Sequence, residues 1–152
     1  MKLLSAKNYL INVKLFVVNT TSDATNKLAV ASAAILFSNI GNGVQVKVNK
    51  NAAGDSGGFL FQTSWSGRAE FGCLGNDDFT LKVSPDGSTY YESWVIDKDS
   101  GDCAFKANIS LPDGVTAPAT VTGQTFLYVD SADGDLKVKF GDGTIKTIAT
   151  DT

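Results

Sequence analysis

Residues 59–97 read FLFQTSWSGRAEFGCLGNDDFTLKVSPDGSTYYESWVID, and this stretch decides the fold class. Short runs of apolar and aromatic residues alternate in it with polar sequences such as GNDD at 75–78 and SPDGS at 84–88. Asp, Asn, Ser and Gly favour turns because they cap a turn or tolerate a positive φ. The stretch therefore predicts four antiparallel strands, at Phe59–Trp65, Ala69–Leu74, Phe79–Ser84 and Thr89–Ile96.

The same alternation continues on both sides of this stretch. It predicts further strands at Leu28–Phe37, Val44–Asn49, Cys103–Ile109, Thr125–Val129, Leu136–Phe140 and Thr144–Ile148. A helix is an open alternative for 28–37, which is rich in alanine, but the lack of charge at helical spacing favours a strand. Turn signals about every eight to twelve residues predict an all-β fold, an antiparallel β-sandwich or barrel-like domain.

Three regions follow from this pattern: residues 1–20, a β-sandwich body at 21–110, and a β-meander at 111–152 that packs on the body or on a neighbouring subunit. In the first region the run YLINVKLFVV is apolar on both faces if it is extended, so it requires cover from both sides. We expect this strand to anchor the chain to another subunit or to a larger assembly. The residues expected to do so are Ile11, Val13, Leu15, Phe16 and Val17.

Composition narrows the range of functions. The chain has 152 residues, enough to bury a core without a metal or a disulfide. Its net charge is −3, and it lacks the basic face with which proteins displace phosphate counterions, so we expect no nucleic-acid partner. It has no histidine, which removes His-based triads and the commonest metal ligand, and we expect no cofactor. No apolar run reaches the ~18 residues of a membrane span, so no membrane insertion is predicted.

The two cysteines, Cys73 and Cys103, each lie in a strand-like run. Two cysteines cannot form a zinc site by themselves. Buried free thiols are the expected state, and a Cys73–Cys103 disulfide remains open if the two strands are neighbours.

Acidic residues raise the alternative of a small glycan hydrolase. Two carboxylates about 5 or 9 Å apart can cleave a glycosidic bond, and the acids nearest the aromatic residues are Glu70, Asp77, Asp78 and Glu92. Asp77 and Asp78 fall in a turn, however, where acids are expected, and a small β domain has little room for a substrate cleft. DSADGD at 130–135 lacks the full calcium-loop pattern and predicts a tight hairpin. We therefore expect no enzyme activity.

Four aromatic residues and one arginine are the candidates for ligand contact: Trp65, Arg68, Tyr90, Tyr91 and Trp94. Aromatic rings can stack on the apolar face of a sugar, but they are also common in cores and in subunit interfaces. By strand alternation Tyr90 and Trp94 share one face, and Tyr91 lies on the other. Arg68 is expected to pair with Glu70 or to lie over an aromatic ring.

Several of these segments together resemble a family of tail and fibre structural proteins of tailed bacteriophages, for which no activity is described. The similarity covers residues 21–101 and is carried by FQT at 61–63, WSGRAE at 65–70, GNDDF at 75–79 and KVSPDGS at 82–88. The end of the chain, at 125–152, is similar to the C-terminal ends of other phage fibre proteins. Such proteins are usually longer and include a helical shaft, which this chain lacks.

The resemblance implies a virion protein with a fibre-like or knob-like fold, assembled in the bacterial host cytoplasm and displayed on the particle exterior. It would be a short fibre or a decoration protein of the head or tail, would form a homotrimer, and would bind other virion proteins and host surface glycans. It supplies no catalytic residues. The alternatives are a monomeric carbohydrate-binding module, which predicts an exposed aromatic row, and the small glycan hydrolase.

Overall fold

The computed structural model describes residues 15–151, and all of the regular structure in that range is β. With no helix between residues 15 and 151, nothing helical there could cross a membrane. The chain divides into two compact units, residues 1–47 and 48–152. The all-β fold with antiparallel sheets, expected from the sequence, is confirmed. The ten strands are β1 (Phe16–Val18), β2 (Leu28–Val30), β3 (Ser56–Thr63), β4 (Ser66–Leu74), β5 (Phe79–Val83), β6 (Tyr91–Ile96), β7 (Cys103–Phe105), β8 (Phe126–Val129), β9 (Leu136–Lys139) and β10 (Ile145–Ala149).

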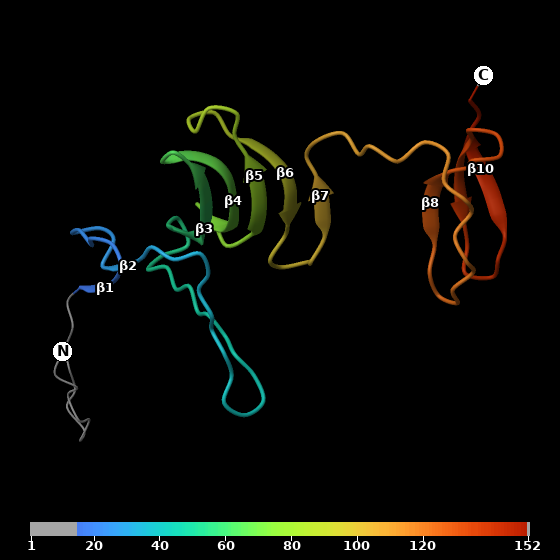
Figure 1. The fold of residues 1–152 in the computed structure, drawn as a ribbon. Helices are drawn as coiled ribbons and strands as arrows, with labels where there is room; N and C mark the ends of the chain where they lie inside the picture. The colour runs from blue at the N-terminus through green and yellow to red at the C-terminus, as the bar shows by residue number, and fades with distance from the viewer. Residues whose placement is uncertain (1–14, 152) are drawn as a thin grey trace. The chain divides into compact units, whose positions relative to one another are not determined.

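Strands β3 to β7 form one antiparallel sheet in sequence order, as Figure 1 shows. Each strand returns beside the previous one because turn residues separate them. Gly75 and Gly87, in the turns on either side of β5, have φ of 78° and 84°, a conformation that costs glycine little. The four strands predicted at 59–96 are confirmed, with ends that differ by a few residues.

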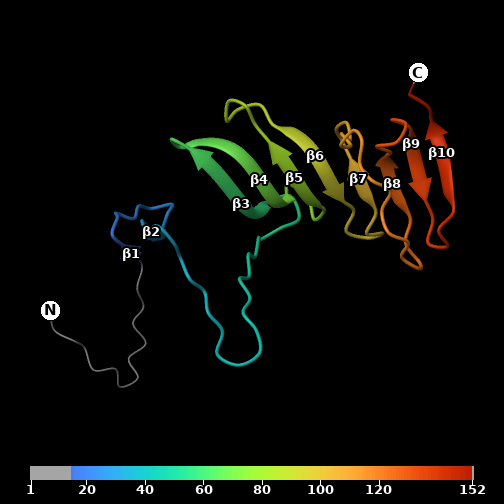
Figure 2. The same cartoon turned by 45° about the vertical axis from the view of Figure 1, so that its right-hand side comes forward.

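The five-stranded sheet is open. Its strand order ends at β3 on one side and at β7 on the other, and these two strands are not paired with each other (Figure 2). Strand β3, with the sequence SGGFLFQT, has eight residues and no charge. Its outer edge therefore lacks the charged or proline residues that usually protect an edge strand from pairing with another chain.

Lys50 fixes the start of this sheet. Its Nζ pairs with the carboxylate of Asp77 at 2.7 Å and donates to the carbonyl oxygens of Ala53 and Asn76 at 2.8 and 2.5 Å. These bonds join the loop before β3 to the turn between β4 and β5. The acidic turn at 75–78 is thus part of the framework of the sheet.

Strands β8 to β10 form a separate antiparallel sheet. The turn at 130–135 closes through hydrogen bonds from the Gly134 and Asp130 amides to the carbonyls of Asp130 and Asp135. Its carboxylates Asp130 and Asp133 bind Lys137 Nζ at 2.9 and 2.5 Å. This is the tight hairpin that the sequence predicts. Tyr128 of β8, 5% exposed, is the one buried hydrophobic residue in the described range.

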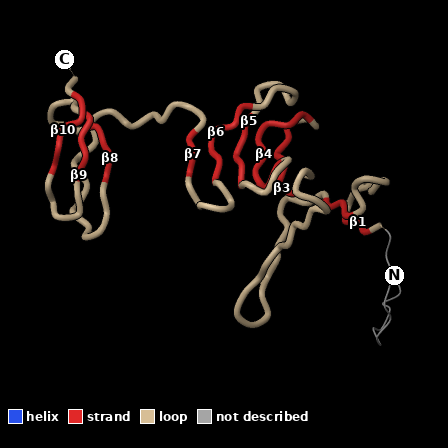
Figure 3. The backbone as a smooth tube through the Cα atoms, turned by 180° about the vertical axis from the view of Figure 1, so that it is seen from behind, coloured by secondary structure: helices blue, strands red, loops and turns tan. Residues whose placement is uncertain are grey.

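The N-terminal unit contains one short parallel pair, in which Phe16 lies opposite Leu28 and Val18 opposite Val30. Strand β2 ends at Val30, so the strand expected to run to Phe37 is much shorter than predicted. The strand predicted at 44–49 is wrong as well: the long loop between β2 and β3 has no strand (Figure 3). Alternation of apolar and polar residues makes a segment suitable for a sheet, but a strand also requires a neighbour to bond with.

Candidate functional site

Register places most of the apolar side chains of the five-stranded sheet on one face. Phe59 lies opposite Phe71, Phe71 opposite Leu81, Leu81 opposite Trp94, and Trp94 opposite Phe105, so one row of large apolar residues crosses all five strands. Residues directly opposite each other share a face. We call this surface the aromatic face; it consists of Phe59, Phe61, Ala69, Phe71, Cys73, Phe79, Leu81, Val83, Tyr91, Trp94, Ile96, Cys103 and Phe105.

Phe71 is at the centre of an aromatic cluster on this face. Its ring centroid lies 5.4 Å from that of Phe59, 5.7 Å from that of Phe61 and 6.1 Å from that of Phe79. Ring pairs at such distances contribute roughly 0.5–1.5 kcal/mol beyond the area they bury. These contacts hold β3, β4 and β5 together from one side of the sheet.

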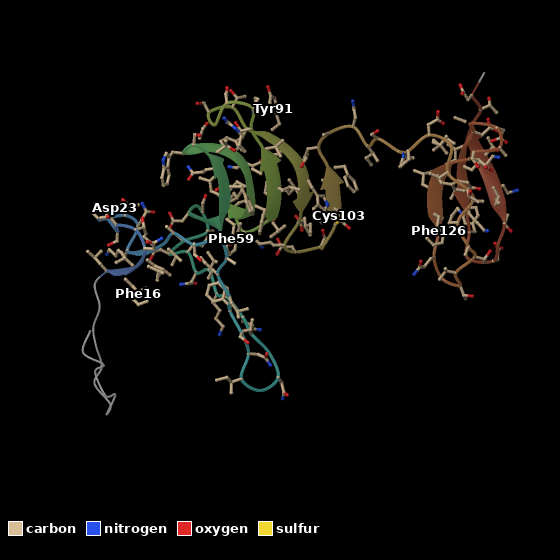
Figure 4. The ribbon with its side chains drawn as sticks, in the orientation of Figure 1. Phe16, Asp23, Phe59, Tyr91, Cys103 and Phe126 are labelled. Carbon is tan, nitrogen blue, oxygen red and sulfur yellow. The ribbon has the colours of Figure 1, made fainter. Side chains whose placement is uncertain are left out.

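Residues 48–151, the unit that contains the sheet, leave most of the aromatic face exposed. None of its side chains is buried, and Phe59, Phe61, Phe79, Val83, Tyr91 and Phe105 are between 39% and 62% exposed. Since an aromatic side chain has roughly 150–250 Å² of surface, five half-exposed rings present on the order of 500 Å² to solvent. Soluble monomers rarely expose an apolar patch larger than a few hundred Å². Phe59, Tyr91 and Cys103, labelled in Figure 4, mark this face on β3, β6 and β7.

The opposite face is polar around one ion pair. Lys82 Nζ lies 2.9 Å from the Glu70 carboxylate and 4.8 Å from the centroid of the Tyr90 ring. The ion pair and the cation–π contact thus both belong to Lys82, and the pairing expected between Arg68 and Glu70 is wrong. Lys82 takes that place because it lies directly opposite Glu70 in the register of β4 and β5.

A bulge in β6 changes which aromatic residues share a face. Leu81 lies opposite Trp94 but Lys82 lies opposite Glu92, so Ser93 is an extra residue in β6. The extra residue reverses the alternation, and Tyr91 falls on the same face as Trp94. The expectation that Tyr90 and Trp94 share a face is therefore wrong. Alternation counted along the sequence cannot reveal a bulge, because a bulge is defined by the partner strand.

The turn between β3 and β4 has an unusual backbone. Thr63 pairs with Ser66, so the loop consists of Ser64 and Trp65, whose φ angles are 49° and 66°. Positive φ at both positions matches a type I′ turn, which normally requires residues such as Asn and Gly. A non-glycine residue held there costs on the order of 1–3 kcal/mol. Trp65, which was expected to end a strand, is instead 90% exposed at the tip of this turn.

Hydrogen bonds from neighbouring segments brace this turn. Gln62 Nε2 donates to the Trp65 carbonyl oxygen at 3.1 Å, and Arg68 Nη1 donates to Ser66 Oγ at 2.9 Å and to the Gly67 carbonyl oxygen at 3.0 Å. Ser66 Oγ in turn donates to the Asp86 carbonyl oxygen at 3.0 Å. Arg68 reaches its two acceptors from a bulge, because Phe61 pairs with Ala69 and Gln62 with Gly67.

The neighbouring turn at 84–89 is itself well ordered. The Thr89 and Ser88 amides donate to Asp86 Oδ1 at 2.7 and 2.8 Å, and these bonds lower the pKa of Asp86 to about 2. Gly87 lies against Ser66, where any side chain would collide with the Ser66 hydroxyl. Two rigid turns therefore support each other at this end of the sheet.

The structure divides the predicted contact residues into two places. Arg68 and Tyr90 contact Gly67, next to the Trp65 turn, whereas Tyr91 and Trp94 lie on the aromatic face. The other predicted contact residues lie in the N-terminal unit: Leu15, Phe16 and Val17 are exposed there, and Ile11 and Val13 lie outside the described residues.

In the described part of the chain, the cysteines and the acids do not form a common site. Cys73 and Cys103 are free thiols, three strand spacings apart on the aromatic face, or roughly 14 Å, too far for a disulfide. Asp78 Oδ1 accepts a hydrogen bond from the Lys98 amide at 3.1 Å and thereby caps a neighbouring turn. Asp77 is paired with Lys50. Within residues 15–151 no group of three or more acids and cysteines is placed to hold a metal ion.

Sequence reasoning missed the aromatic face as a whole. The alternating phenylalanines of FLF at 59–61 and the apolar residues of FTLKV at 79–83 were the available signal, but they indicate only that one side of each strand is apolar. Comparison of the chain with family models, with curated proteins and with solved structures finds no match.

Proposed function

We propose that this chain is a structural subunit displayed on the exterior of a bacteriophage particle, as a short fibre or a decoration protein of the head or tail. In this proposal it works as a homotrimer bound to other virion proteins. The observation that supports a structural, oligomeric role is the uncovered aromatic face. The phage setting and the number three come from the resemblance of residues 21–101 and 125–152 to phage tail and fibre proteins.

The energetics of the aromatic face favour association. Burial of apolar surface contributes about 25 cal/mol per Å², so roughly 500 Å² on each subunit corresponds to about 12 kcal/mol before the costs of association. Those costs are on the order of 4–15 kcal/mol. The face is thus large enough to support a stable interface between copies, and too large to remain in water without cost.

The open edge of β3 also favours association. An uncharged eight-residue edge strand readily pairs with another chain, and oligomers remove such edges by covering them. Identical subunits each carry this edge and this face, and in a trimer they meet around a three-fold axis. Closed symmetry then buries all of them at once.

The runner-up is a monomeric carbohydrate-binding module, and one observation favours it: the indole of Trp65 is 90% exposed. In that case the aromatic face would have to be covered without a second copy of the chain. The two proposals differ in the molar mass that they predict for the protein in solution.

The test is the molar mass by light scattering after size-exclusion chromatography. One chain has a mass of 16.0 kDa, so the proposal expects about three times this value, or 48 kDa. Phe61→Asp, which introduces a charge on the aromatic face, should reduce the mass to that of one chain. Leu60→Asp is the matched control, since Leu60 is 49% exposed against 54% for Phe61 but lies on the other face. A wild-type mass near 16 kDa would reject the oligomer.

The particle itself provides the second test. Antibodies raised against the chain should label intact particles in electron micrographs of phage lysates. Labelling of disrupted particles alone would place the protein inside and reject exterior display.

A further inference from the structure

We propose that Trp65, at the tip of the β3–β4 hairpin, is a glycan-contact residue whose indole stacks on a pyranose ring. This inference rests on the proposed function in one respect: a subunit on the particle exterior would present the tip to host surface polysaccharide. The site is separate from the aromatic face that is proposed to hold the subunits together.

The backbone is the first reason. Ser64 and Trp65 both have positive φ in a two-residue loop where Asn and Gly would fit without strain. Tryptophan is among the residues least suited to that conformation, since it is bulky and gains no local hydrogen bond from its side chain. A residue that disfavours its own turn is a candidate for a role other than folding.

Exposure is the second reason. The side chain of Trp65 is 90% exposed, so it contributes almost nothing to the packing of its own chain. The turn that presents it is nevertheless held in place by Gln62 and Ser66, and Ser66 is fixed by the turn at 84–89. Because the backbone of this turn is already held in place, little of its conformational freedom is lost when a ligand binds to the ring.

The surroundings of the ring indicate the class of ligand. Polar side chains flank Trp65 along the chain, namely Gln62, Thr63, Ser64, Ser66 and Arg68. Among the described residues, the only side-chain hydrogen bonds of Arg68 are made by Nη1, although a guanidinium has five N–H donors. One aromatic plane with polar groups at its margin matches a sugar ring, which has an apolar C–H face and hydroxyl groups around its edge. An apolar protein partner would instead require a continuous apolar patch, such as the aromatic face.

The experiment measures binding of the full-length chain to immobilised bacterial surface polysaccharides and to short hexose and N-acetylhexosamine oligosaccharides. Trp65→Gly removes the ring and the strain together, and Trp65→Phe retains a ring. Ser64→Gly is the matched control, because it relieves strain in the same turn and keeps the indole. Thermal unfolding and molar mass are recorded for each variant.

We expect wild type and Ser64→Gly to bind at least one of these glycans equally. Trp65→Gly should bind at least tenfold more weakly, and Trp65→Phe should fall between them. Both glycine variants should unfold at temperatures about 2–8 °C above wild type, since both remove strain. The mass of all three variants should equal that of wild type.

Several results would overturn the proposal. They are no binding to any of the glycans, equal binding by Trp65→Gly, or a lower unfolding temperature for Trp65→Gly. Failure of the proposed function is distinguishable from these results, since a monomeric wild type that binds glycan through Trp65 rejects the oligomer and retains the site.

Discussion

Gly58 of β3 and Gly72 of β4 lie directly opposite each other, and neither position has room for a β-carbon. A Cβ on Gly58 would lie 2.5 Å from the Phe71 carbonyl oxygen, and one on Gly72 would overlap the Gly57 carbonyl oxygen. Gly72 also has a φ of 144°, which residues with a side chain rarely adopt. The two strands that hold Phe59 and Phe71 can therefore approach only because both residues are glycine.

Replacement of Gly72 by alanine should destabilise the five-stranded sheet strongly. The strained φ alone costs on the order of 1–3 kcal/mol, and the overlap with β3 adds to it. Urea unfolding followed by circular dichroism measures the loss. Gly54→Ala is the control, because no atom lies within 4 Å of its Cβ position and its φ is not positive, so its stability should differ little from wild type. Equal stability of the two variants would contradict the close approach of β3 and β4.

Asp86 should make the turn at 84–89 sensitive to acid. Its pKa is lowered to about 2 by hydrogen bonds from the Thr89 and Ser88 amides, against an ordinary value of 3.8. A lowered carboxylate pKa stabilises the fold above the unfolded pKa, and this contribution is lost as the pH falls through the folded one. Asp86→Asn should therefore unfold at a lower temperature than wild type at pH 7, and the difference should close between about pH 4 and pH 2.

The control for Asp86 is Asp113→Asn, which alters an exposed acid outside the strands. Its unfolding temperature should follow that of wild type across the same pH range. A gap between Asp86→Asn and wild type that stays constant down to pH 2 would mean that the carboxylate charge does not stabilise this turn.

Lys137 should stabilise the C-terminal sheet. Its ammonium group binds Asp133 and Asp130, which raises its pKa, and these bonds lower the pKa of both carboxyls. The raised lysine pKa gives a contribution that is lost in strong alkali, and the lowered carboxyl pKa values give one that is lost in acid. Lys137→Met should accelerate amide hydrogen exchange in residues 126–149 at neutral pH, as measured by mass spectrometry.

Lys98→Met provides the comparison for Lys137. The Lys98–Asp99 pair is exposed, and exposed pairs contribute roughly 0–1 kcal/mol. Exchange in residues 126–149 should be unchanged in this variant, and exchange near its own turn should change little. If Lys137→Met also left exchange in β8 to β10 unchanged, the part-buried ion pairs of Lys137 would not support the sheet.

The reactivity of the two thiols should show whether a neighbouring subunit covers the aromatic face. Both are free, and Cys103 is exposed whereas Cys73 is half-buried. In the Phe61→Asp variant, which is expected to be a monomer, Cys103 should react with a maleimide first. In the wild-type oligomer Cys103 should react at least tenfold more slowly, because a neighbouring subunit covers it. Equal rates in the two proteins would show that the interface lies elsewhere.

The sequence was informative wherever a feature depends on neighbours along the chain. Turn residues and period-2 alternation located the strands from Ser56 to Phe105 and from Phe126 to Ala149, to within a few residues. The expected hairpin at 130–135 is present for the same reason, since its Asp and Gly residues act within the turn itself. Turns of this kind are formed by residues that are neighbours in the sequence, so the sequence alone can locate them.

Sequence pattern failed where a strand depends on its partner. Val44, Val46 and Val48 alternate as regularly as any strand in the chain, yet the segment pairs with no other strand in the structure and is not a strand. The same limit explains the contact residues. Tyr91 and Trp94 share a face only because Ser93 is bulged, and Lys82 rather than Arg68 meets Glu70 because of register.

The sequence by itself determined an antiparallel all-β chain, its turns and the apolar character of its strands, because those properties arise from each residue and its neighbours. Only the tertiary structure decided that the large apolar residues of the five-stranded sheet share one face and are not buried there, and that Trp65 occupies a strained, exposed turn. Register, bulges and burial are set by contacts between residues far apart in the chain, and alternation along a single strand does not encode them.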